Sequence, residues 1–250
     1  YVGSRDICMM PSVVDVAGLN RISRLIFQRA TAAICGMVTI GLETNIQENE
    51  KPIIAASMFG NTTTCVDACR DALSDKGFEV LVFHGTGTGG KTMEALVDEG
   101  LVDMVLDITT TEWADTLCDG VFNAGDTRLD APGKKGIPHL IVPGCIDMAN
   151  FGGPETIPAR YNDRLFYEWN PSVTLMRTNA EENYAMGKIF AEKANAAKGP
   201  VSFLIPQQGF SILDSIDEDG RAQHFWDPSA DQAFCDGLQQ HLKANITVTF

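Results

Sequence analysis

Residues 80–100 read VLVFHGTGTGGKTMEALVDEG, and this stretch decides the fold. The residues before the glycines, 79–83, form a short apolar run typical of a buried strand. Residues 92–99 then show helical spacing, and Gly100 stands where a glycine ends a helix. A strand, a glycine-rich loop and a helix in succession indicate one unit of an α/β sheet.

The same alternation continues on both sides of this stretch. Apolar runs of strand length occupy residues 52–58, 79–83, 103–108, 139–144, 201–206 and 245–250. Helical segments lie between them, at 64–73, 92–99, around Trp113 and Cys118, at 181–197 and at 231–242. Strands that are apolar throughout are buried on both faces, as in a parallel sheet covered by helices. We therefore predict a doubly wound, mostly parallel, Rossmann-like α/β domain with three layers, spanning 51–250.

The first part of the chain has a different pattern. Apolar residues at helical spacing predict a long helix over about 17–37, and the polar segment ETNIQENEKP (43–52) indicates a linker. At the other end, residues 245–250 form a strand with no helix after it. We therefore expect the domain to be clipped at its C-terminus.

Charge and cysteine content narrow the classes of partner. The chain carries 33 acidic and 19 basic residues, a net charge of −14, which repels nucleic acids and anionic membranes. Seven cysteines without a CxxC pair indicate reduced thiols in a cytoplasmic protein. The longest uncharged apolar run, 31–42, is too short to span a bilayer. A small anion is compatible with this charge, because local backbone amides can bind one, especially beside a metal ion.

The glycine-rich loop fits two phosphate-binding patterns. Gly85, Gly90, Lys91 and Thr92 match GxxxxGK[ST], the P-loop pattern, whereas Gly85, Gly87 and Gly90 match the dinucleotide pattern GxGxxG. Asp107, at the end of the next predicted strand, suits both patterns, as a Mg²⁺ ligand in the first and a ribose acceptor in the second. The spacing alone leaves both alternatives open.

Polar loops follow several strands, and in such sheets ligands bind beyond the carboxyl ends of the strands. Glycines let the backbone approach an oxyanion, and helix N-termini supply unpaired amides. The predicted anion-binding set is therefore Gly60, Thr62, Thr63, Thr64, Gly85, Thr86, Gly87, Thr88, Gly89, Gly90, Lys91, Thr109, Thr110, Thr111 and Arg177. For the threonine runs the alternative is helix capping, and for Arg177 it is a structural salt bridge.

Two residues are candidates for chemistry. His84 ends a predicted strand beside the loop and could act as a general acid, or could simply bind a nearby carbonyl group. Asp107 could hold Mg²⁺ or cap the following turn. Glu112, the last residue of TTTE, is interpreted as a carboxylate at a helix start, where the helix dipole favours it.

Several long blocks resemble one particular family. They are PIIAASMFGNTTTCVDAC, VLVFHGTGTGGKTMEALVDEG, VLDITTTEWADTLCDGV, IPHLIVPGCIDMANFG, NPSVTLMRTNAEEN and GPVSFLIPQQGFSILD. They resemble the uncharacterised family with an ATP-binding domain that includes a tomato protein blocking tomato mosaic virus replication. The resemblance implies two α/β domains in tandem, with residues 1–45 as the end of the first and its connecting helix, and 51–250 as most of the second. The ligand that it implies is ATP.

This sequence departs from the family pattern at four positions. Gly85 replaces an alanine, Lys91 replaces the commoner arginine, Thr92 replaces a small residue, and Trp169 stands where the family has histidine. The GxxxxGKT match thus depends on substitutions in this chain, which counts against an inherited P-loop and puts the roles of Lys91 and Thr92 in doubt. If the histidine matters in relatives, Trp169 implies lost or altered activity.

The leading hypothesis is binding of ATP or a related phosphorylated small molecule, as a homo-oligomer. An enzyme would use Asp107 or His84 around a magnesium-bound phosphate, whereas a non-catalytic sensor would present a nucleotide-dependent conformation to a protein partner. A third hypothesis is an oxidoreductase domain that binds NAD through the GxGxxG loop.

Overall fold

The computed structural model describes residues 7–43 and 51–250, in two compact units that comprise 1–50 and 51–250. The first unit contains helix α1 (Arg21–Glu43), which begins and ends later than the predicted 17–37. Its start is set by Asn20, whose side chain accepts hydrogen bonds from the amides of Ile22 and Ser23. Most of the predicted linker, 44–50, lies outside the described residues. No helix in the described ranges is long and apolar enough to cross a membrane.

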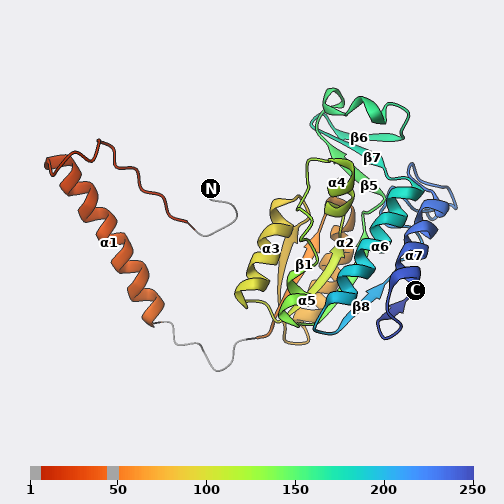
Figure 1. Ribbon diagram of the computed structural model, residues 1–250, viewed down its shortest axis with the longest axis horizontal. Coiled ribbons are helices and arrows are strands. Elements are labelled where there is room, and N and C mark those ends of the chain that lie inside the picture. The colour runs from red at the N-terminus through yellow and green to blue at the C-terminus, as the bar shows by residue number, and fades with distance from the viewer. Residues whose placement is uncertain (1–6, 44–50) are drawn as a thin grey trace. The chain divides into compact units, whose positions relative to one another are not determined.

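The second unit is built on a six-stranded sheet (Figure 1). Its strands are β1 (Ile53–Met58), β2 (Glu79–His84), β3 (Met104–Thr109), β4 (His139–Gly144), β8 (Val201–Leu204) and β9 (Thr247–Thr249). Every neighbouring pair is parallel, and the order is β2-β1-β3-β4-β8-β9. The predicted doubly wound, parallel α/β sheet is confirmed.

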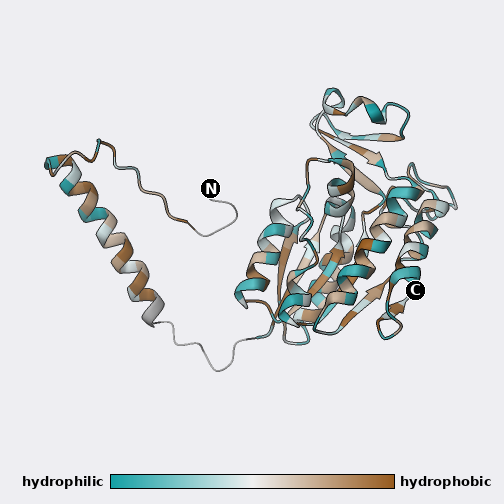
Figure 2. Cartoon of the chain, viewed as in Figure 1, coloured by the Kyte–Doolittle hydropathy of each residue, from teal (hydrophilic) through white to brown (hydrophobic). Residues whose placement is uncertain are grey.

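Helices cover both faces of this sheet. On β1, Ala55 packs with Met93 and Val97 of α3 (Thr88–Glu99), whereas its neighbour Ala56 packs with Val66 of α2 (Thr63–Ser74). Helices α6 (Ala180–Ala196) and α7 (Pro228–His241) complete the large core beside β4 and β8. Two short helices, α4 (Glu112–Cys118) and α5 (Ala131–Lys135), precede them along the chain. In Figure 2 the central strands are largely brown, whereas teal residues lie along the helices around them. The three-layer prediction is therefore confirmed.

A second, antiparallel sheet was not predicted. It consists of β5 (Met148–Phe151), β6 (Phe166–Asn170) and β7 (Val173–Arg177), in the order β5-β7-β6, with 3-10 turns at Pro154–Thr156 and Ala159–Tyr161. Thr111, just beyond β3, donates a hydrogen bond to the Met148 carbonyl at 3.0 Å, so this sheet stands beyond the carboxyl end of the parallel one. Figure 1 shows β5, β6 and β7 together at the top, opposite the end where the chain enters β1.

Helix α3 begins at Thr88, four residues before the predicted start at 92. Glycine has low helix propensity, so Gly89 and Gly90 disfavour a helix at these positions. The structure shows why glycine is nevertheless required, because a Cβ on Gly89 would lie 1.8 Å from the His84 carbonyl oxygen. Close packing thus overrides propensity, and part of the predicted loop is the first turn of a helix.

Candidate functional site

The topology places a candidate site where the strand order reverses. From β1 the chain proceeds to β2 on one side and then crosses to β3 on the other, so the reversal lies between β1 and β3. Ligands of doubly wound sheets bind in the crevice at this point, outside the carboxyl ends of the strands. Here Thr62, which follows β1, and Thr109, which ends β3, bring their hydroxyl oxygens within 2.6 Å of each other.

The glycine-rich loop beside this crevice already holds an anion from the chain itself. Glu112 Oε1 accepts hydrogen bonds from the amides of Gly87 at 2.7 Å and Gly90 at 3.1 Å. A Cβ on Gly90 would lie 2.1 Å from Glu112 Oε2, and Gly87 adopts φ = +81°, which favours glycine. Two of the predicted phosphate-binding amides therefore bind a buried carboxylate.

A buried ion-pair network stands behind Glu112. The Arg128 guanidinium, fully buried, contacts Glu112 Oε2 at 2.7 Å and both carboxylate oxygens of Asp107. His139 Nε2 lies 2.9 Å from Asp107 Oδ2, and Glu94 Oε1 lies 3.3 Å from Arg128. Burial alone would raise the pKa of Asp107, but Arg128 and His139 hold it below its usual range.

The contacts of Asp107 leave its carboxylate little scope to act as a Mg²⁺ ligand. Both of its oxygens are used inside the protein, and its side chain has no exposed surface. Over the described residues, no group of three or more His, Cys, Asp or Glu side chains is arranged to hold a metal ion. The Asp107 carboxylate is thus positioned to anchor Arg128, and any Mg²⁺ would need other ligands.

The threonines predicted as phosphate ligands divide into buried and accessible groups. Thr109, Thr110 and Thr111 are fully buried, and the Thr111 hydroxyl also accepts a hydrogen bond from Asn150. The Thr63 hydroxyl bonds the Phe59 and Gly60 carbonyl oxygens within its own turn. Thr64, in the first turn of α2, is exposed, and its hydroxyl has no hydrogen bond within 51–250.

The α2 start, meaning the 3-10 turn Gly60–Thr62 and the first turn of α2 that follows it, also offers backbone donors. Within the described residues, the amides of Gly60 and Asn61 have no acceptor, whereas the Thr62 amide bonds the Phe59 carbonyl oxygen. Beside them is a cavity of about 260 Å³, lined by Asn61, Thr62, Cys65, Ile108, Val142, Gly144, Pro206, Gly209, Phe210, Ser211, Ile212 and Ser215. Asn61 Oδ1 is buried and lacks a hydrogen-bond partner, which is uncommon for a buried amide oxygen.

The remaining predicted loop residues lie on the rim of the β2 side. His84, Thr88 and Lys91 are exposed, Thr86 and Gly89 are half-buried, and Gly85 is buried. The Gly85 amide bonds the Met58 carbonyl oxygen at 2.7 Å, which ties the loop after β2 to the end of β1. The edge therefore brings the loops after β1 and β2 together.

Arg177 lies apart from that rim and is buried. Its guanidinium donates to the carbonyl oxygens of Phe225 at 2.7 Å and Asp227 at 3.3 Å, and it pairs with Asp231 at 2.8 Å and Asp214 at 3.4 Å. These contacts match the salt-bridge alternative considered for this residue. Burial, together with Asp214, raises the pKa of Asp231 to about 8 despite the arginine.

Several residues of this edge were not found from the sequence. Arg128 sits in a loop without a motif, and Glu112 was interpreted only as a helix-start carboxylate. Asp147, just beyond β4, accepts a hydrogen bond from Ser211 at 2.7 Å, while its Oδ1 has no partner. Burial raises the pKa of Asp147 to about 7. The sequence did offer one indication of Glu112 and Asp147, because each is an acidic residue shortly after an apolar strand.

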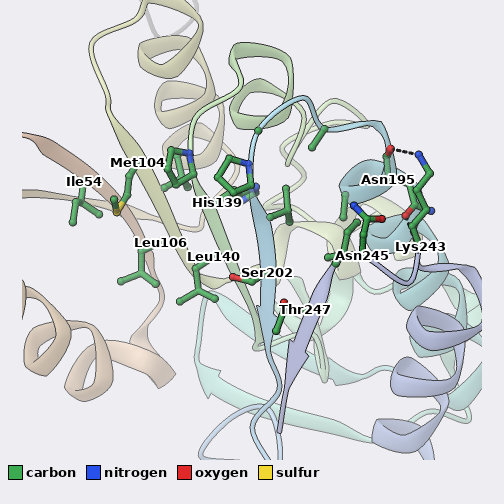
Figure 3. A pocket seen from close by; sticks show the side chains of 18 of the residues that line it. Ile54, Met104, Leu106, His139, Leu140, Asn195, Ser202, Lys243, Asn245 and Thr247 are labelled. Carbon is green, nitrogen blue, oxygen red and sulfur yellow. Dashed lines mark hydrogen bonds between the residues drawn. The ribbon is translucent and has the colours of Figure 1, made fainter.

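A cavity larger than the one beside Asn61 lies away from this edge. Its volume is about 610 Å³, and Figure 3 shows Ile54, Met104, Leu106, Leu140, Ser202 and Thr247 lining one face of five strands. Asn195 and Lys243 close one end, joined by a hydrogen bond from the lysine amide to Asn195 Oδ1 at 2.8 Å. This hollow lies against one face of the sheet, not beyond the carboxyl ends of the strands where doubly wound proteins bind their ligands, so size alone does not locate the functional site.

The fold and its polar carboxyl edge define a doubly wound α/β protein of the Rossmann-like class. The chain belongs to the uncharacterised protein family UPF0261, because the model of that family's C-terminal domain matches residues 51–250. The model of the family's N-terminal domain matches residues 1–43.

Individual relatives agree with this assignment. The chain is 47% identical over 218 residues to a UPF0261 protein of Clostridium tetani, covering 87% of this chain and 54% of the relative. It is 45% identical over 245 residues to a UPF0261 protein of Mesorhizobium japonicum, covering 98% and 59%. The ToMV resistance protein Tm-1(GCR237) of Solanum lycopersicum is 41% identical over 248 residues, covering 98% and 32%. The chain thus spans little more than half of the bacterial relatives and about a third of the tomato protein.

Proposed function

We propose that this chain binds ATP or a related phosphorylated small molecule at the β1/β3 crevice, with a phosphate at the start of α2. The observation that carries the proposal is the pair of free amides at Gly60 and Asn61, in a turn that is followed by the exposed Thr64 in the first turn of α2. Unpaired backbone amides favour an anion, and the turn that carries them leads into α2, whose dipole places partial positive charge at that end. The strand reversal at this position is where doubly wound proteins hold their ligands.

The proposal moves the main phosphate contact away from residues 85–90. Gly87 and Gly90 already donate to Glu112, so a phosphate there would have to displace a carboxylate paired with Arg128. His84 and Lys91 are exposed and able to contact the outer part of a ligand. Mg²⁺ would arrive bound to the phosphates of ATP.

A charge-reversal variant tests this site. Thr64→Glu places a carboxylate in the first turn of α2, where the helix dipole tolerates it, so the protein should remain folded. The same carboxylate repels a phosphate. In calorimetric titrations with ATP–Mg²⁺ and with inorganic phosphate, we expect at least about tenfold weaker binding, corresponding to ~1.4 kcal/mol.

The matched control is Ser74→Glu, the same charge at the other end of the same helix. It should bind ATP as the unchanged protein does. The proposal is overturned if neither ATP nor phosphate binds, or if Thr64→Glu binds as tightly as the control. NAD serves as a further ligand, and preferential binding of NAD would favour the oxidoreductase hypothesis.

Whether bound ATP is consumed distinguishes an enzyme from a sensor. His84 is the accessible candidate for proton transfer, since Asp107 is enclosed by Arg128 and His139. Phosphate release from ATP that falls in His84→Gln would support an enzyme. Binding without release would support a nucleotide-dependent interaction protein.

A further inference from the structure

An exposed tryptophan lies directly against the proposed phosphate site. Trp169 belongs to β6 of the second sheet, yet its ring atom Cζ2 lies 3.6 Å from the position that a Cβ on Gly60 would take. The indole therefore packs on the residue whose amide is free. A segment more than a hundred residues away in sequence thus forms one wall of the α2 start.

The surface beside this wall is aromatic. Trp169 is 44% exposed and Tyr167 is 37% exposed, and their ring centroids are 6.4 Å apart. Tyr167 is also 5.6 Å from the His224 ring. Burying an indole is favourable, so an exposed aromatic surface next to a polar crevice favours the binding of an aromatic or apolar ligand group.

We propose that Trp169 is the stacking surface for the base of a nucleotide whose phosphate binds at the start of α2. This inference rests on the proposed function and narrows its ligand class to nucleotides, in preference to sugar phosphates. Stacking suits this position because an aromatic ring binds any base through its face and needs no hydrogen-bond pattern. The contact with Gly60 keeps base and phosphate sites adjacent, as a single nucleotide requires.

Tryptophan fluorescence reports on the contact. The chain has three tryptophans, of which Trp113 is buried and donates to the Arg128 carbonyl oxygen at 3.2 Å. AMP and ATP should quench the emission of Trp169, whereas ribose 5-phosphate should not. Trp226→Phe, which removes the other tryptophan that is not fully buried, should leave the quenching intact.

Affinity supplies the second measurement. Trp169→Ala should weaken AMP binding at least fivefold and leave ribose 5-phosphate binding unchanged, because base–aromatic stacking is worth about 1–3 kcal/mol. Trp169→Phe keeps an aromatic surface and should retain most of the affinity. Circular dichroism should show both variants folded, since the side chain is partly exposed.

The outcomes separate the two proposals. If AMP and ribose 5-phosphate bind equally and Trp169→Ala changes neither, the stacking inference is wrong while the phosphate site stands. If no phosphorylated compound binds, both are overturned. If Trp169→Ala weakens both ligands equally, the indole shapes the loop without stacking on a base, and the inference also falls.

Discussion

Glu112 accepts hydrogen bonds from the amides of Gly87 and Gly90 and pairs with Arg128 without exposing its side chain, so its charge is compensated by one cation and two dipoles. Removing one partner of such a buried pair leaves the other uncompensated. The glycine-rich loop, the start of α3 and the arginine network therefore share a single acceptor.

Glu112→Ala should lower the free energy of unfolding by about 3–5 kcal/mol, because Arg128 and the two amides lose their acceptor. Glu112→Gln keeps an oxygen for the amides and should cost less. Urea denaturation measures both changes, with the exposed Glu218→Gln as the control. A loss below ~1 kcal/mol in Glu112→Ala would show that the network contributes little.

At the scale of elements, the parallel strands were predictable because each is an uninterrupted apolar run. Ala55 and Ala56 illustrate the reason, since adjacent residues of one strand are buried against α3 and α2 respectively. The second sheet gave no such signal. Strand β6 (FYEWN) exposes four of its five residues, and only the turn residues Asn170 and Pro171 marked a hairpin.

The first turn of α3 provides a test in which propensity and packing oppose each other. On propensity, Gly90→Ala should stabilise a helix by about 1 kcal/mol. Because its Cβ would lie 2.1 Å from Glu112 Oε2, we expect net destabilisation. Gly36→Ala in α1, where a Cβ meets no atom within 4 Å, is the matched control and should not destabilise. Thermal unfolding followed by circular dichroism measures both, and a gain in stability for Gly90→Ala would contradict the packing.

For the molecule as a whole, buried carboxylates set how stability depends on pH. Burial raises the pKa of Asp115 to about 8, and that of Asp147 to about 7, against about 3.9 in an unfolded chain. Between these values the folded protein holds protons that the unfolded chain has released. Stability from these groups is therefore complete at low pH and declines as pH rises to about 8.

We predict that the free energy of unfolding falls between pH 5 and pH 8, and that Asp115→Asn makes this slope shallower. Urea denaturation at several pH values is the measurement, and the exposed Asp163→Asn should leave the slope unchanged. Asp107 acts in the opposite direction. Because its pKa is lowered in the folded protein, its contribution to the free energy of unfolding is lost only when acid protonates it. A flat profile would mean that Asp115 is ionised in the folded protein.

The candidate site was predictable only in part. Topology follows from the apolar runs, and it places the loops after β1, β2 and β3 at one edge. The sequence does not show which backbone amides at that edge are free. The answer depends on the folded structure, in which the Glu112 carboxylate contacts the amides of Gly87 and Gly90. Trp169 lies near Gly60 because the second sheet places it there, and the sequence of that sheet has no apolar periodicity that would have predicted its strand pairing.

The carboxylate in the glycine-rich loop also has a consequence for competition. Glu112 is tethered to the amides that it binds, so it acts as an intramolecular ligand whose effective concentration reaches at least the millimolar range for flexible tethers. A rigid fold raises that value much further. A dissolved phosphate at cellular concentrations would therefore lose to it at Gly87 and Gly90. A sequence that matches a phosphate-loop pattern can thus fold into a loop whose amides bind a carboxylate of the same chain.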